Sequence, residues 1–238
     1  MLKKTTNKIF LLFVFALFLP RASFGEVVLH DNIGLVKEEV TITAETKGRY
    51  FSKGGALVSF SAEGKSIGSV LSGGDGFAYK SYVPQKPGLT RIIAKYGRDK
   101  DNGIVMALKK GSSIVFVDVE GSLLAGPFSK RSIEGSNQAI KNITNKYPVV
   151  YLHAGNLGLK SIKEWLRKNR FPESVVMSWD MGSLFAELGK KGFRIKAIIG
   201  SQAVIESAAE YKPLAYSFDE FGGALHVNDW KEIENGLK

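Results

Sequence analysis

Two acids beside a short apolar run are the residues best suited to chemistry in this sequence. Asp118 follows "SIVFV" directly, Glu120 comes two residues later, and Gly121 and Ser122 come next. An aspartate at the end of a strand can attack phosphorus, and a second acid can protonate the leaving oxygen and then activate water. Both carboxylates can also bind Mg²⁺, which prefers oxygen ligands. The pattern therefore predicts a phosphoryl-transfer site, and a polar turn after a buried strand is the alternative.

Alternating strands and helices must position these acids. From Gly111 on, apolar runs alternate with helical patterns, as in "PVVYLHAG" followed by "LKSIKEWLRKNR". Repeated strand–helix units predict an open parallel sheet with right-handed crossovers. Ligands of such sheets bind outside the carboxyl ends of the strands. The polar residues that follow each strand, His153 and Ser201 among them, are therefore the further candidates.

The first part of the chain has a different pattern. In "EEVTITAET" the residues Val40, Ile42 and Ala44 fall on one face of a predicted strand. About six such segments with Gly-rich turns predict a β-sandwich over residues 26–108, followed by an α/β domain over residues 109–238. The tripeptide His30-Asp31-Asn32 is interpreted as a turn or cap.

The N-terminal residues have the pattern of a secretory signal peptide. The basic "MLKKTTNK" precedes the apolar "IFLLFVFALFLP" and the small-residue segment "RASFG", which predicts a signal over residues 1–25. The alternative, an uncleaved anchor, is disfavoured because a span needs about 20 apolar residues. We therefore expect a periplasmic or secreted protein with no transmembrane segment after cleavage.

Composition excludes some kinds of chemistry and partner. The chain has no cysteine, which rules out disulfides, thiolate catalysis and cysteine metal sites. It has 33 basic and 23 acidic residues, a net charge of +10, and four of the basic residues lie in the predicted signal. No interleaving of aromatic and basic residues is present, so we expect no nucleic-acid partner.

The second half resembles a known family. "IVFVDVEGSL" is similar to the first motif, hhhhDxDG[TS], of the haloacid dehalogenase (HAD) superfamily. "PVVYLHAGNLGLKSIKEWLRKNRFPESVVMS" resembles the branch of that superfamily related to lipin-type phosphatidate phosphatases. The resemblance covers residues 111–238. It implies a HAD-like Rossmannoid fold and a Mg²⁺-dependent phosphatase that forms an aspartyl-phosphate.

The resemblance also implies roles for individual residues. Asp118 takes the place of the nucleophile and Glu120 that of the acid/base, and both are expected to bind Mg²⁺. The expected phosphate-binding residues are Ser122, His153 and Lys196, with Lys190 and Lys191 as alternatives for the lysine. The remaining metal positions fall on Ser201 and Glu206.

Three positions depart from the family pattern. Glu120 is one methylene longer than the usual aspartate, His153 replaces a serine or threonine, and Ser201 replaces an acid. Three functions therefore stay open. One is an exported phosphohydrolase acting on a phosphorylated small molecule, lipid or macromolecule. The second is a catalytically inactive HAD-fold binding or envelope-associated protein. The third, an adhesin or structural protein of the envelope, rests only on the predicted β-sandwich and signal peptide.

The first half resembles bacterial immunoglobulin-like domains. The residues that carry this likeness are "GALVSFSAEGKSIGSVLSGGDGFA" and, after them, "PGLTRIIAKY". Such modules occur in adhesins and exported enzymes. The resemblance implies a β-sandwich that acts as a spacer or contact surface, with a component of the cell envelope as a possible partner.

Overall fold

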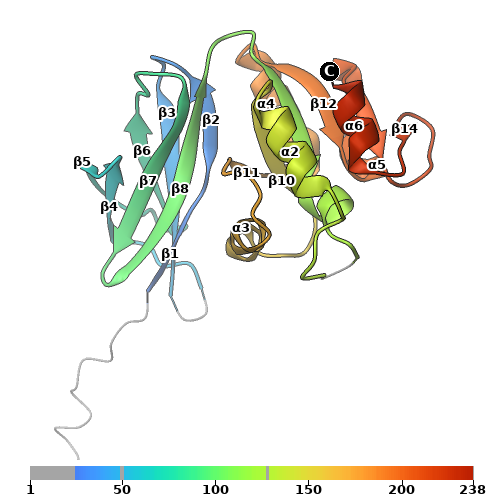
Figure 1. Cartoon of the computed structure of the whole chain (residues 1–238). Coiled ribbons are helices and arrows are strands. Elements are labelled where there is room, and N and C mark those ends of the chain that lie inside the picture. Colours follow the sequence, from blue (N-terminus) through green and yellow to red (C-terminus); the bar gives the residue numbers. More distant parts are fainter. Residues whose placement is uncertain (1–24, 49–50, 127–128, 238) are drawn as a thin grey trace, which may run out of the picture.

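The computed structural model describes residues 25–48, 51–126 and 129–237. A β-sandwich and an α/β domain lie side by side (Figure 1). The predicted signal peptide lies outside the described residues, apart from Gly25. Within the described ranges, no helix has both the length and the apolar character needed to cross a bilayer.

The sandwich consists of two sheets. The first has the order β1-β3-β6 and the second has the order β2-β8-β7-β4-β5. The strands are β1 (Glu26–Leu29), β2 (Asn32–Leu35), β3 (Val40–Lys47), β4 (Leu57–Ala62), β5 (Lys65–Leu71), β6 (Phe77–Tyr82), β7 (Gly88–Tyr96) and β8 (Asp99–Leu108). The chain changes sheets between β1, which pairs antiparallel with β3, and β2, which pairs parallel with β8. This arrangement is immunoglobulin-like, as the sequence predicted.

The sandwich forms because its strands alternate between buried and exposed residues. In β3, Val40, Ile42 and Ala44 are buried, and Thr41 between them is exposed. Phe60 of β4 and Ile92 of β7 meet them from the second sheet in one hydrophobic cluster. The period of two found in the sequence therefore identified the inward face.

The second domain contains a six-stranded parallel sheet with the order β11-β10-β9-β12-β13-β14. Its strands are β9 (Ser113–Asp118), β10 (Val149–His153), β11 (Val176–Ser178), β12 (Arg194–Ile199), β13 (Leu214–Ser217) and β14 (Leu225–His226). Every pairing in it is parallel. The predicted parallel sheet is confirmed. The sequence did not indicate β14, which has only two residues, both exposed.

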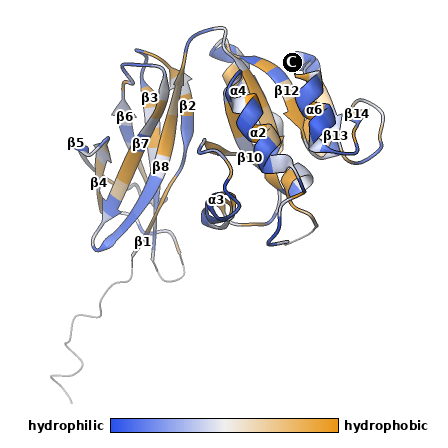
Figure 2. Cartoon of the chain, viewed as in Figure 1, coloured by the Kyte–Doolittle hydropathy of each residue, from blue (hydrophilic) through white to orange (hydrophobic). Residues whose placement is uncertain are grey.

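Helices cover both faces of this sheet. Val115 and Val117 of β9 pack with α2 (Ser136–Thr144), α3 (Leu159–Lys168) and α6 (Trp230–Gly236). Ile114 and Phe116 point to the other face, where α4 (Ser183–Lys190) and α5 (Gln202–Glu206) lie. The single turns η1 (Val119–Leu123), η2 (Asp180–Gly182) and η3 (Ala209–Tyr211) complete the fold. Figure 2 shows hydrophobic strands of the sheet behind α2 and α6, whose outer sides are mostly hydrophilic.

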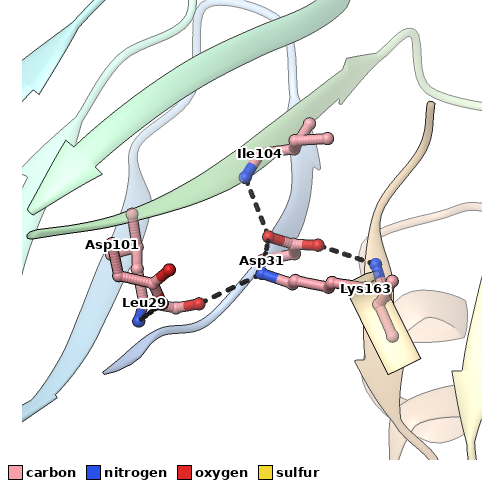
Figure 3. A network of polar contacts seen from close by, with 6 residues as sticks. Leu29, Asp31, Asp101, Ile104 and Lys163 are labelled. Carbon is pink, nitrogen blue, oxygen red and sulfur yellow. Dashed lines mark hydrogen bonds and ion pairs between the residues drawn. The ribbon is translucent and has the colours of Figure 1, made fainter. Parts of the chain in front are cut away.

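A buried aspartate joins the two domains. Asp31, in the bend between β1 and β2, accepts hydrogen bonds from the backbone N–H groups of Ile104 and Val176, each at 2.8 Å. Its Oδ1 also lies 2.6 Å from Nζ of Lys163 on α3, which in turn donates to the carbonyl of Leu29 at 3.2 Å (Figure 3). Asp31 lies in a turn between strands, as the sequence was interpreted, but two of its three partners, Lys163 and Val176, lie in the other domain.

Burial controls the ionisation of this aspartate. Loss of water raises the pKa of the Asp31 carboxyl, and the Lys163 ammonium and the two backbone N–H groups oppose that rise. The side chain of Asp31 is 1% exposed and that of Lys163 is 22% exposed. Ile33, Leu35 and Met106 add an apolar contact with the core around α4 and α5. The interface therefore combines an apolar area with one nearly buried ion pair.

We expect Asp31→Asn to lower the free energy of unfolding by about 2–4 kcal/mol, because it leaves the Lys163 ammonium without its counter-charge in a desolvated position. Urea unfolding followed by circular dichroism would measure this. Glu26→Gln is the matched control, because Glu26 and Lys160 form an exposed interdomain pair at 2.7 Å whose loss should cost less than about 1 kcal/mol. Equal losses in the two variants would contradict the role assigned to Asp31.

Candidate functional site

The candidate site lies where the order of the sheet reverses. From β9 the chain builds β10 and β11 on one side and then returns to place β12 on the other side of β9. In such sheets the connections after the two central strands diverge and leave a crevice outside their carboxyl ends, where ligands bind. Asp118 ends β9, and Ser201 comes two residues after the end of β12. The structure therefore brings these two predicted site residues together.

The carboxylate of Asp118 is enclosed by internal donors. Its Oδ1 accepts from the backbone N–H of Gly121 at 3.0 Å. Its Oδ2 accepts from the hydroxyl of Ser201 at 2.8 Å and from the backbone N–H of Ser201 at 3.2 Å. Asp118 is 1% exposed. The residue predicted as a nucleophile thus has both oxygens bonded within the chain and almost no exposed surface.

Glycines let the backbone approach this carboxylate closely. A Cβ added at Gly121 would lie 2.3 Å from Oδ2 of Asp118, and one at Gly200 would lie 2.5 Å from its Cβ. Real Cβ atoms do not approach other atoms this closely, so both positions require glycine in the present packing. The sequence reasoning assigned no contact role to Gly200, although its place between an apolar strand and Ser201 was a usable signal.

Glu120 turns away from Asp118 toward the end of β10. Its Oε1 lies 3.1 Å from Nδ1 of His153, and its Oε2 accepts from the backbone N–H of Ala154 at 3.4 Å. When the Glu120 carboxylate is ionised it can only accept, so the Nδ1–H of His153 is the donor of this hydrogen bond. A Cβ added at Gly155 would lie 2.7 Å from Oε1, so the backbone after β10 packs directly on this acid. Two predicted site residues, Glu120 and His153, are thus partners of one another.

The side chain of Ser122 stabilises the turn after β9. Its hydroxyl donates to the carbonyl of Asp118 at 2.6 Å and lies 3.4 Å from the carbonyl of Ile199. The side chain is buried, and its hydrogen bonds go to backbone oxygens. The structure therefore gives Ser122 a contact that joins η1 to β9 and β12.

The predicted lysine lies away from Asp118. Lys196 is the third residue of β12 and its Nζ is 5.8 Å from the centre of the Tyr147 ring, just before β10 begins. Gly200, which packs on Asp118, is four residues further along, about 13 Å at the rise of a strand. At this place in β12 Lys196 lies away from Asp118, and its role in phosphate binding stays a prediction. The alternative Lys191 donates to the carbonyl of Ile33 at 3.2 Å.

The predicted second metal acid also lies apart. Glu206 ends α5 and accepts from the side-chain amide of Gln202 at 2.6 Å. At the rise of a helix it stands about 7.5 Å beyond Ser201 along the axis. Ser201 occupies the N-cap position of α5 but makes no capping hydrogen bond with its side chain, because its hydroxyl is used by Asp118.

The donors do not fit a Mg²⁺ site in this arrangement. Among the described residues, no group of three or more His, Cys, Asp and Glu side chains is placed to hold a metal ion. Mg²⁺ is usually held by one or two carboxylates with free oxygens, together with water and phosphate. Here Asp118 and Glu120 both direct their oxygens to internal partners.

We expect Gly121→Ala to destabilise the protein by about 1–3 kcal/mol, because its Cβ would overlap the Asp118 carboxylate. Gly126→Ala is the control, since a Cβ there meets no atom within 4 Å. Thermal unfolding of the three proteins would measure the difference. A Gly121→Ala variant as stable as the control would show that the close packing around Asp118 is absent.

Comparisons with known proteins add no family assignment. No family model matches the chain. No curated protein matches it either.

Solved structures give weak likenesses. They include the D00-D0 domain of intimin (22% identity, 36% of this chain and 46% of that one, TM-score 0.30) and the fibronectin(III)-like modules of CbhA from Clostridium thermocellum (21% identity, 35% and 97%, TM-score 0.24). A carbohydrate acetylesterase from Xanthomonas citri matches at 12% identity over 89% of this chain and 67% of that one, with a TM-score of 0.33. The chain spans about half of the two intimin structures, 46% and 56%. Likenesses of this size carry no conclusion about activity.

Proposed function

We propose that this chain is a non-catalytic, envelope-associated binding protein in which an immunoglobulin-like domain is joined to a degenerate HAD-like domain. One observation carries the proposal. Asp118 stands at the crevice in the position of the nucleophile. It is 1% exposed, and both of its carboxylate oxygens are hydrogen-bonded within the chain. A nucleophile must instead present a free lone pair to the phosphorus atom of its substrate.

The HAD-like part of the proposal rests on position. The stretch "IVFVDVEGSL" places an aspartate at the carboxyl end of a central parallel strand, beside the point where strand order reverses. That is where an open α/β sheet binds its ligands. The residues around this aspartate support loss of catalysis, because Ser201 supplies no charge and Glu120 is paired with His153.

A phosphoryl group also needs positive charge around it in the transition state. Among the described residues, no lysine or arginine side chain is bonded to Asp118 or Glu120. The imidazole of His153 faces Glu120, with Nδ1 3.1 Å from its Oε1. The arrangement therefore offers little to neutralise a transferring phosphoryl group.

The second candidate is an exported Mg²⁺-dependent phosphohydrolase that acts through an aspartyl-phosphate. The position of Asp118 at the crevice favours it. For this function Asp118 must release Ser201, attack the phosphate ester and expel the alcohol, which Glu120 would protonate before activating water. The substrate would be a phosphorylated small molecule, lipid or macromolecule.

Export is part of both candidates. The N-terminal pattern of residues 1–25 and the resemblance of residues 26–108 to immunoglobulin-like modules of exported bacterial proteins support a periplasmic or secreted location. A component of the cell envelope is the partner that fits this setting.

An activity assay separates the two candidates. We expect no turnover of phosphate monoesters or phosphatidate by the purified protein with Mg²⁺, and no difference between it and Asp118→Asn. Release of inorganic phosphate is the measurement. Mg²⁺-dependent turnover that Asp118→Asn abolishes would overturn the non-catalytic proposal and establish the phosphohydrolase.

Restoring the missing acid gives a second test. In Ser201→Asp two carboxylates face one another, so we expect a lower Tm than that of the unaltered protein when Mg²⁺ is absent. Added Mg²⁺ should raise the Tm of this variant by about 2–4 °C for each kcal/mol that Mg²⁺ binding adds to the free energy of unfolding. Ser201→Asn is the control of equal size without charge. The unaltered protein should show no change in Tm with Mg²⁺, and a rise in its Tm would contradict the account of the donor set.

A further inference from the structure

The amino edge of the parallel sheet carries a row of exposed cations. In the spatial order β10, β9, β12 and β13, each strand is preceded or begun by at least one of them. They are Lys146 before β10, Lys109 and Lys110 before β9, Lys190 and Arg194 before and at the start of β12, and Lys212 before β13. At the spacing of neighbouring strands this row extends over about 14 Å. We call these six residues the amino-edge row.

The segments that lead into β9 and β12 lie side by side and bring Lys110 and Arg194 of the row close to one another. The backbone N–H of Gly111 donates to the carbonyl of Gly192 at 2.9 Å, which joins the segments that lead into these two strands. A Cβ on Gly111 would lie 3.7 Å from Nη2 of Arg194, and one on Gly192 would lie 3.0 Å from Cε of Lys110. The two cations therefore extend along the same small patch of backbone.

The cations of the row lack counter-charges. Among the described residues, no carboxylate lies within ion-pair distance of any of the six. Glu187 and Glu210 lie in segments that lead to the same edge, but neither forms an ion pair there. Lys190 and Lys146 stand near the ends of α4 and α2, where a helix dipole favours a cation. Lys109, Lys110 and Arg194 have no such local role.

The opposite edge of the sheet carries acids. Asp180 follows β11, and Asp219 and Glu220 follow β13, all three exposed, whereas Asp118 and Glu120 at this edge are bonded within the chain. The excess of exposed positive charge therefore lies at the amino edge. Such an asymmetry orients a protein at a charged surface, with the cationic edge toward negative charge.

We propose that the amino-edge row is a docking surface for an anionic lipid bilayer. Five of the six cations are lysines, whose compact charge suits a diffuse anionic surface, whereas arginine is favoured where single phosphates are held by two parallel hydrogen bonds. Leu214, which is 38% exposed at the start of β13, adds an apolar side chain to the same edge. In this orientation the crevice at Asp118 faces away from the membrane.

This docking surface would specify the partner in the proposed envelope association, namely an anionic bilayer. It does not depend on whether Asp118 is catalytic. It needs only the described fold and the charges at one edge. A failure of vesicle binding would therefore remove this inference alone, and phosphatase activity would remove the non-catalytic proposal alone.

Vesicle co-sedimentation tests the surface. The protein without residues 1–25, which precede β1, is mixed with phosphatidylcholine vesicles with and without phosphatidylglycerol. We expect binding only to the anionic vesicles, weakening as salt increases. The triple variant Lys110→Gln, Arg194→Gln, Lys212→Gln should bind about 100-fold more weakly, since each cation near an anionic bilayer contributes about fivefold.

A second triple variant controls for net charge. Lys65→Gln, Lys95→Gln, Lys100→Gln removes the same charge from exposed positions on the sandwich and should retain the binding of the unaltered protein. Circular dichroism checks that both variants fold. Equal weakening in the two variants, binding to neutral vesicles, or binding to soluble polyphosphate without binding to anionic vesicles would each overturn the proposal.

Discussion

A buried carboxylate must find donors inside the protein, and the crevice of the α/β domain is built around that constraint. Asp118 meets it with the N–H of Gly121 from the turn after β9 and with the hydroxyl and N–H of Ser201 from the turn after β12. The two turns that diverge at the reversal of strand order are thereby tied together. Close approach at this point requires glycine at 121 and 200. The low exposure of Asp118, 1%, goes together with these hydrogen bonds.

The interface between the domains also contains a buried carboxylate that is bonded to donors within the protein. Asp31 accepts from two backbone N–H groups and from the Lys163 ammonium, so a carboxylate in the bend between two strands of the sandwich binds α3 and β11 of the other domain. Apolar residues of β2 and β8 complete the contact with the core around α4 and α5. The immunoglobulin-like domain therefore contacts the parallel-sheet domain both at α3 and at the core around α4 and α5.

The sequence predicted what depends on local pattern. Alternation in β3 and apolar runs such as that of β9 identified the strands and the position of Asp118 at a strand end. The sequence did not predict the directions of the side-chain oxygens. Glu120 contacts His153 because β9 and β10 are neighbours in the folded sheet, which the local pattern does not reveal. The role of Asp31 was missed because Lys163 and Val176 are 132 and 145 residues away. The contact of Lys196 with Tyr147 was not predictable, because a lysine within a strand gives no sign of the edge toward which it extends.

In the proposal above, Asp118 is a structural carboxylate and not a nucleophile. A crystal structure of the protein soaked with Mg²⁺ and BeF₃⁻, which forms an acyl-phosphate analogue on a reactive aspartate, tests this most directly. We expect Oδ1 and Oδ2 of Asp118 to keep their hydrogen bonds to Gly121 and Ser201, with no beryllium on the carboxylate. Density for BeF₃⁻ on Asp118 with Mg²⁺ beside it would instead show that Asp118 is a nucleophile.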